Sequence, residues 1–142
     1  MILSVTNENK LNEYNNLYRN NNLKGLYIYK VYSESCFYCT LMQDEWNKLK
    51  NDEIINDISL VEIESDFKNS IENKMISDVY RYPTIFISYN NQPPIVFEEE
   101  RLCKNFLSFI KNNLKKYTKR GGVSKTKRKK NKSKKSVKKS QK

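Results

Sequence analysis

Short runs of aromatic, Leu and β-branched residues alternate along this chain with segments of helical periodicity. Runs of this kind bounded by Asn, Gly or Pro are typical of strands. Five are present, at residues 2–5, 26–32, 58–63, 85–89 and 95–97. The first is short enough for an edge strand. The turn Asn90-Asn91-Gln92-Pro93 joins the last two and predicts a β-hairpin.

Apolar residues spaced three or four apart predict four amphipathic helices. They cover residues 7–22, 36–51, 69–77 and 101–116, and Lys24-Gly25 is a helix-stop signal after the first. Trp46 and Phe106 on these helices, with Phe86 on a strand, are candidates for the core. The order β-α-β-α-β-α-β-β-α combines parallel units with an antiparallel hairpin, so we expect an α/β fold with a mixed sheet covered by helices.

Charge divides the chain into two parts. The 27 Lys and Arg and 16 Asp and Glu give a net charge of +11. Thirteen of the basic residues and none of the acidic ones lie in residues 118–142, which leaves 14 basic against 16 acidic residues for the body. We expect residues 1–117 to form one domain and residues 118–142 a disordered basic tail, because the tail has too few apolar residues to offset the entropy of ordering.

Composition also excludes several classes of chemistry. The chain has no His, so Ser-His, Cys-His and His-metal sites are ruled out. Its first residues are apolar for too short a run to be a secretory signal, and no run approaches the roughly 18–20 apolar residues of a membrane span. We therefore expect a soluble protein in a reducing compartment, where three cysteines do not form a disulfide framework.

The sequence Cys36-Phe37-Tyr38-Cys39 lies between a predicted strand and a predicted helix. Free amide groups and the positive end of a helix dipole stabilise a thiolate at such a position, and the thiolate is the reactive form of cysteine. A second cysteine one turn further can reach the first. The arrangement indicates a redox-active dithiol.

A second motif strengthens this interpretation. Arg81-Tyr82-Pro83-Thr84 leads into a strand and lies 44 residues after Cys39. With the dithiol, it resembles the thioredoxin family, in which such a proline forms a cis peptide beside the dithiol. The resemblance covers about residues 3–116 and implies a thioredoxin-like three-layer sandwich with a central mixed sheet.

The resemblance also assigns roles to residues. Cys36 is the nucleophile of thiol–disulfide exchange and Cys39 resolves the mixed disulfide. Pro83 shapes the loop facing Cys36, and the backbone of Tyr82 pairs with an extended substrate. Phe37 and Tyr38 complete the expected substrate-binding set. The partners implied are protein thiols and disulfides, with no cofactor beyond the redox-active disulfide and no metal.

Three residues depart from the family pattern. Lys30 stands where many members carry a buried acid behind the dithiol, and Ser35 replaces a common Trp. The dipeptide Phe37-Tyr38 lacks the Pro of many relatives. Two roles for Lys30 remain open, since it can stabilise a nearby thiolate or extend its ammonium to solvent.

Other interpretations of the cysteines are weaker but distinct. The Tyr before Cys39 resembles the glutaredoxin site, yet Phe97-Glu98-Glu99-Glu100-Arg101 replaces the glutathione-binding Gly-Gly-x-Asp segment of that family. A zinc site needs about four Cys or His ligands, and this chain has three Cys and no His, so zinc binding is a weak alternative. Cys36 and Cys39 could also be ordinary buried cysteines, as we expect for Cys103, or belong to a non-catalytic binding module.

The basic tail predicts an anionic partner. Its Lys and Arg runs suit nucleic-acid phosphates or an anionic membrane surface, and they also fit a nuclear import signal. Gly121-Gly122 followed by Lys, Arg and Ser resembles C-terminal tails on proteins of large DNA viruses. That resemblance implies the host cytoplasm or the virion. The direction of the reaction, as reductant, oxidant or isomerase, stays open.

Overall fold

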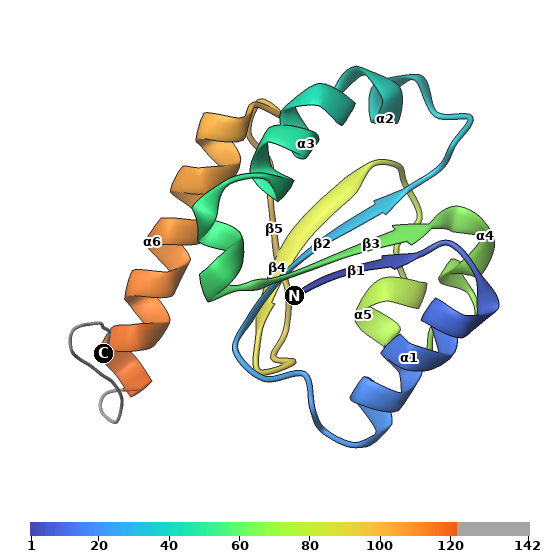
Figure 1. Cartoon of the computed structure of the whole chain (residues 1–142), viewed down its shortest axis with the longest axis horizontal. Helices are drawn as coiled ribbons and strands as arrows, with labels where there is room; N and C mark the ends of the chain where they lie inside the picture. Colours follow the sequence, from blue (N-terminus) through green and yellow to red (C-terminus); the bar gives the residue numbers. More distant parts are fainter. Residues whose placement is uncertain (122–142) are drawn as a thin grey trace. The chain divides into compact units, whose positions relative to one another are not determined.

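The computed structural model describes residues 1–121. A five-stranded mixed sheet forms the centre of the unit Met1–Ile110 (Figure 1). Its strands, in the order β1-β3-β2-β4-β5, are β1 (Ile2–Val5), β3 (Ser59–Glu64), β2 (Leu26–Tyr32), β4 (Thr84–Tyr89) and β5 (Ile95–Val96). The first three are parallel, and β4 and β5 are antiparallel additions. The predicted mixed sheet is confirmed, with β1 at one edge.

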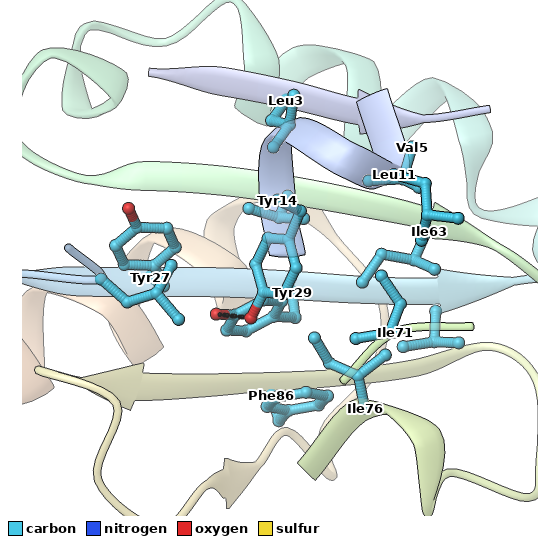
Figure 2. Packing of buried hydrophobic residues seen from close by; sticks show 13 residues of the cluster. Leu3, Val5, Leu11, Tyr14, Tyr27, Tyr29, Ile63, Ile71, Ile76 and Phe86 are labelled. Atoms are coloured by element: carbon cyan, nitrogen blue, oxygen red, sulfur yellow. Dashed lines mark hydrogen bonds between the residues drawn. The ribbon is translucent and has the colours of Figure 1, made fainter. Parts of the chain in front are cut away.

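Alternation along the strands divides the core into two layers. On one face a cluster of buried residues joins the sheet to α1 (Glu8–Arg19) and α5 (Lys74–Ser77), and Figure 2 shows how it packs. There the Tyr29 ring stacks on Phe86 with centroids 4.8 Å apart, and its hydroxyl lies 2.8 Å from that of Tyr14. Aromatic pairs of this kind add stabilisation beyond their buried area.

The opposite face is covered by α3 (Gln43–Lys50) and by the part of α6 (Cys103–Gly121) that reaches Ile110. Trp46 and Phe106 are both fully buried there and meet edge to face, with centroids 5.5 Å apart. The predicted core positions of Trp46, Phe86 and Phe106 are confirmed. This is the face that lies beneath the cysteines.

The first helix ends earlier than predicted. Asn7 caps α1 by accepting a hydrogen bond from the Lys10 amide, and the helix stops at Arg19. Asn21 has φ 55°, and the Asn22 amide donates to the Leu17 carbonyl, as in a Schellman motif. The stop signal assigned to Lys24-Gly25 was therefore wrong, because asparagine can also adopt the left-handed conformation that ends a helix.

Two other predicted helices are divided. The segment 36–51 forms α2 (Phe37–Leu41) and α3, which meet at Met42. The helix predicted at 69–77 was wrong over its first half, because Asn73 is the N-cap of α5 and a separate turn, α4 (Ser65–Lys68), comes before it. A 3₁₀ helix, η1 (Glu53–Asp57), was not predicted.

The last helix, α6, runs from Cys103 to Gly121. Along the sequence it therefore continues past Ile110, the last residue of the compact unit Met1–Ile110. The predicted boundary between residues 117 and 118 stays a prediction. Helix α6 includes residues 118–121 of the predicted basic tail. The rest of that tail, residues 122–142, with its partners and its expected disorder, lies outside the described residues. Within residues 1–121, no helix is both long and apolar enough to cross a membrane.

Candidate active site

Cys36 occupies the N-cap position of α2, at the point where the chain leaves β2. Its backbone is extended (φ −85°, ψ 122°), and its Sγ accepts a hydrogen bond from the Cys39 amide at 3.2 Å. The Cys36 amide is held in turn by the Ser33 carbonyl at 3.1 Å. This cap brings the two cysteines together as free thiols. Cys36 is partly exposed, whereas Cys39 is only 6 % exposed.

The two thiols differ in acidity. Desolvation raises the pKa of Cys36, but hydrogen bonds from the Cys39 side chain and from the amides of Cys39 and Tyr38, with the charge of Arg101, outweigh it and lower the pKa. For Cys39, burial is the largest effect and the hydrogen bond to Cys36 adds to it, raising the pKa to about 11. Cys36 is therefore the more acidic thiol of the reduced pair, and Cys39 is the less acidic one.

The loop before β4 faces Cys36. The Tyr82–Pro83 peptide bond is cis. As a thiol, Cys36 Sγ donates to the Tyr82 carbonyl oxygen at 3.6 Å. Thr84 Oγ1 donates to the Arg81 carbonyl at 2.7 Å, which closes the loop across Tyr82 and Pro83. The structure thus brings Tyr82 and Pro83 to the dithiol.

Large apolar side chains are exposed on α2 and in the segment that precedes the cis-proline. Phe37 and Tyr38 are 68 % and 59 % exposed. Leu41 and Tyr80, which were not predicted from the sequence, are exposed to a similar or greater extent. A groove of about 600 Å³ begins at Pro83 and continues between the segment around Tyr80 and strand β5. Exposed apolar groups of this kind are typical of surfaces that contact another polypeptide.

Lys30 lies behind the dithiol and is buried, with 2 % exposure. Its Nζ is 3.5 Å from Glu62 Oε1 and lies over the ring of Tyr32, so extension of the ammonium to solvent was a wrong alternative. The aromatic rings and the carboxylate provide the partners that water would otherwise supply. The sequence analysis did not predict Glu62 as the partner of Lys30. An acidic residue inside an apolar strand was a signal that its carboxylate is buried and needs a partner.

Cys103 is separate from this pair. It is half-buried at the start of α6, where its amide donates to Glu45 Oε1 at 2.8 Å, and burial followed by the charges of Asp52 and Glu45 raises its pKa. The expectation of a packing role therefore agrees with its environment. Among the residues that the structure describes, no group of three or more His, Cys, Asp or Glu is arranged to hold a metal ion.

The hydrogen bond between the two sulfurs can be tested by alkylation. In the variant Cys39→Ala, made together with Cys103→Ser, the pKa of Cys36 is expected to rise, because a donor to its thiolate is lost. The measurement is the pH dependence of the rate of iodoacetamide modification, compared with Cys103→Ser alone after reduction. An unchanged midpoint would show that the Cys39 thiol does not stabilise the thiolate.

Comparison with known proteins places this geometry in a family. The sequence model named Thioredoxin matches residues 5–116. Among curated proteins, no sequence match was found. The structure resembles the J-Trx1 fragment of ERdj5, with a TM-score of 0.59 and 14% identity over 80% of this chain and 52% of that one.

Two further structures are similar. The zinc-bound form of human ERp44 gives a TM-score of 0.58 and 15% identity over 80% of this chain and 31% of that one. Thioredoxin from Malassezia sympodialis, Mala s 13, gives 0.57 and 10% identity over 79% and 90%. The chain thus spans about half of the ERdj5 fragment and about a third of the ERp44 chain. At these identities the likeness establishes the fold.

Proposed function

Because this chain belongs to the thioredoxin family, we propose that it is a thiol–disulfide oxidoreductase that reduces, forms or exchanges disulfides in protein substrates. The observation that carries the proposal is the unequal pair of thiols, one partly exposed with a lowered pKa and one buried with a raised pKa. Two cysteines that only pack in the core are not expected to differ in this way. In thiol–disulfide exchange the difference has a role, because the exposed, more acidic thiol attacks the substrate and the buried one resolves the mixed disulfide.

The reaction proceeds in two exchange steps. The Cys36 thiolate attacks one sulfur of a substrate disulfide, the substrate S–S bond breaks, and the other substrate sulfur leaves as a thiolate. Cys39 then loses its proton and attacks the Cys36 sulfur, so that a Cys36–Cys39 disulfide forms and the second substrate sulfur leaves. The substrate gains two electrons and the protein loses two. The reverse sequence forms a disulfide in the substrate, and no group beyond the dithiol is needed.

Protein substrates are favoured by the surface near Cys36. The exposed rings of Phe37 and Tyr38 and the groove beginning at Pro83 offer apolar area to an extended chain. The Tyr82 carbonyl, which accepts the weak hydrogen bond from Cys36, becomes available to a substrate amide once Cys36 is in a mixed disulfide. We assign substrate contacts to these residues. The compartment, the viral source and an anionic partner of the tail remain predictions.

The decisive experiment measures the Cys36/Cys39 couple. In the Cys103→Ser variant, the pair is expected to pass reversibly between dithiol and disulfide as the ratio of reduced to oxidised glutathione changes. The populations are quantified by acid quenching, alkylation and mass spectrometry. A second-power dependence on reduced glutathione is expected for an intramolecular disulfide. If no intramolecular disulfide forms at any ratio, the proposed function is wrong.

A further inference from the structure

A buried charge network lies beneath the dithiol, on the face of the sheet covered by α3. Lys30, in the middle of β2, is its central cation. The Lys30 ammonium lies 3.5 Å from Glu62 Oε1 and 3.4 Å from Gln43 Oε1. The ring centroids of Tyr32 and Trp46 lie 4.5 Å and 5.2 Å away from it. The ammonium is therefore fixed in one place within the core.

Glu62 holds this ammonium in position. It stands opposite Lys30 in the register of β2 with β3. Its carboxylate also accepts hydrogen bonds from Trp46 Nε1 at 2.9 Å, from Ser4 Oγ at 2.5 Å and from Lys50 Nζ at 2.9 Å. Two ammonium groups thus share one carboxylate, and of the two only that of Lys30 is buried, since the Lys50 side chain is partly exposed.

Cys39 is the reacting group that this charge reaches. Its thiol must lose a proton before it can attack, and burial together with the Cys36 sulfur makes that loss unfavourable. A hydrogen bond with the backbone of Ser33, and after it the charge of Lys30, act in the opposite direction on the pKa of Cys39. Desolvation lowers the pKa of Lys30 itself, and Glu62, followed by Cys39, opposes that shift. The lowering of the pKa of Cys36, by contrast, depends on hydrogen bonds from Cys39 and Tyr38 in α2 and on the charge of Arg101.

We infer that Lys30, positioned by Glu62, promotes the resolving step of the reaction by stabilising the developing thiolate of Cys39. The inference rests on the proposed function and assigns to it a positioning residue of the opposite charge to the acid expected behind the dithiol. The Cys39 proton leaves to solvent. The sulfur then bonds to Cys36, and the electron pair of the broken bond leaves with the substrate sulfur.

The other titratable groups around Cys39 and Lys30 do not replace this cation. Burial, followed by the charges of Glu62 and other acids, raises the pKa of Tyr32 to about 12, so its phenol is neutral. Glu62 is the neighbouring anion from β3, and Lys50 reaches it from α3 with a partly exposed side chain. Cys36 is in the mixed disulfide, and so uncharged, when Cys39 attacks.

The test separates the two steps in the full chain. Reduced protein carrying Cys103→Ser is mixed with one equivalent of a symmetric aromatic disulfide whose thiolate is coloured. The first release reports attack by Cys36 and the second reports resolution by Cys39. In Lys30→Met the pKa of Cys39 is expected to rise. Each unit of that rise lowers the thiolate fraction tenfold but makes the thiolate more nucleophilic, so the second release should slow by about three- to tenfold per unit. The first release keeps its rate.

The pH profile distinguishes an electrostatic role from a structural one. The second release in Lys30→Met should approach the unsubstituted rate as the pH passes the pKa of Cys39, because both proteins then carry the thiolate. Lys30→Arg, which keeps the charge, is expected to restore the rate at neutral pH. A loss of both steps that high pH does not reverse would overturn the inference.

Two matched variants complete the experiment. Lys50→Met removes the other cation on Glu62 and is expected to leave the second release unslowed. Lys30→Gln with Glu62→Gln removes both charges while keeping polar side chains, and it should reproduce the slow step if Lys30→Met fails to fold. A second release as fast as in the unsubstituted protein overturns the inference alone. Absence of that release in the unsubstituted protein overturns the proposed function.

Discussion

Replacing Cys36 with serine is expected to abolish disulfide exchange, with a loss of at least about a thousandfold in turnover. The Cys36 sulfur is partly exposed and accepts the Cys39 amide at 3.2 Å, and these contacts lower its pKa. A serine hydroxyl in the same position stays protonated at neutral pH and forms no disulfide. Cys39 cannot substitute for it, because it is buried and its pKa is about 11.

The full chain reduces a protein disulfide in the presence of an excess of a dithiol reductant. The rate is measured as the loss of the substrate's disulfide with time. Cys103→Ser is the matched control, since it changes the third cysteine of the chain at a site away from the pair. It should keep nearly full activity. Equal rates for Cys36→Ser and the unsubstituted protein would assign the chemistry to another group and contradict the proposed mechanism.

The charge behind the dithiol bears on the direction of the reaction. Groups that stabilise thiolates favour the reduced pair and make the disulfide a stronger oxidant. Here the hydrogen bonds to Cys36 lower its pKa and so stabilise the thiolate of the more acidic cysteine. Lys30 acts on Cys39, whose high pKa keeps it protonated at equilibrium, so its influence falls on the rate of resolution and less on the potential. The potential and the rate are thus controlled by different contacts.

Local patterns predicted the strands and the dithiol well. The apolar runs of β2 and β4 mark buried strands regardless of what packs on them. The Cys36-to-Cys39 motif and the Tyr82-Pro83-Thr84 motif each carry their signal within a few residues. The structure joins them through the contact of Cys36 Sγ with the Tyr82 carbonyl.

Contacts between distant segments account for what the sequence did not predict. Asn73 starts α5 because its side chain caps the Met75 amide while its Nδ2 donates to Tyr14 and to Asn91, which are far away in the chain. The pairing of Lys30 with Glu62 depends on the register of β2 against β3. A one-residue slip would turn one of the two side chains to the other face of the sheet. No local signal specifies such a register.

Replacing Glu62 with alanine is expected to reduce the free energy of unfolding by about 3–5 kcal/mol, because removal of one partner leaves a buried charge uncompensated. Lys30 would lose its carboxylate, and the Trp46 Nε1–H and the Ser4 hydroxyl would lose their acceptor. Since single domains have only about 5–15 kcal/mol of stability, the variant should unfold at much lower urea concentration. Urea titration followed by Trp46 fluorescence measures the change.

The control for charge is the double variant Lys30→Met with Glu62→Gln, in which no buried charge is left unpaired and Trp46 keeps an acceptor. It should recover a large part of the lost stability, because buried pairs contribute little beyond apolar replacements. Glu72→Ala, which removes an exposed ion pair with Arg19, should hardly move the midpoint. If Glu62→Ala unfolds at the same urea concentration as Glu72→Ala, the network does not stabilise the fold.

Acid titration gives this prediction a second, independent readout. Burial raises the pKa of Glu62, but hydrogen bonds from Ser4 and Lys50 and the charge of Lys30 outweigh it and hold the pKa below its ordinary value. The stabilisation from Glu62 is therefore complete above the pKa that glutamate has in the unfolded chain, and it is lost as the pH falls through the lower folded value. The unsubstituted protein should lose this contribution on acidification. The double variant should not, so its stability should fall less steeply between neutral and acidic pH.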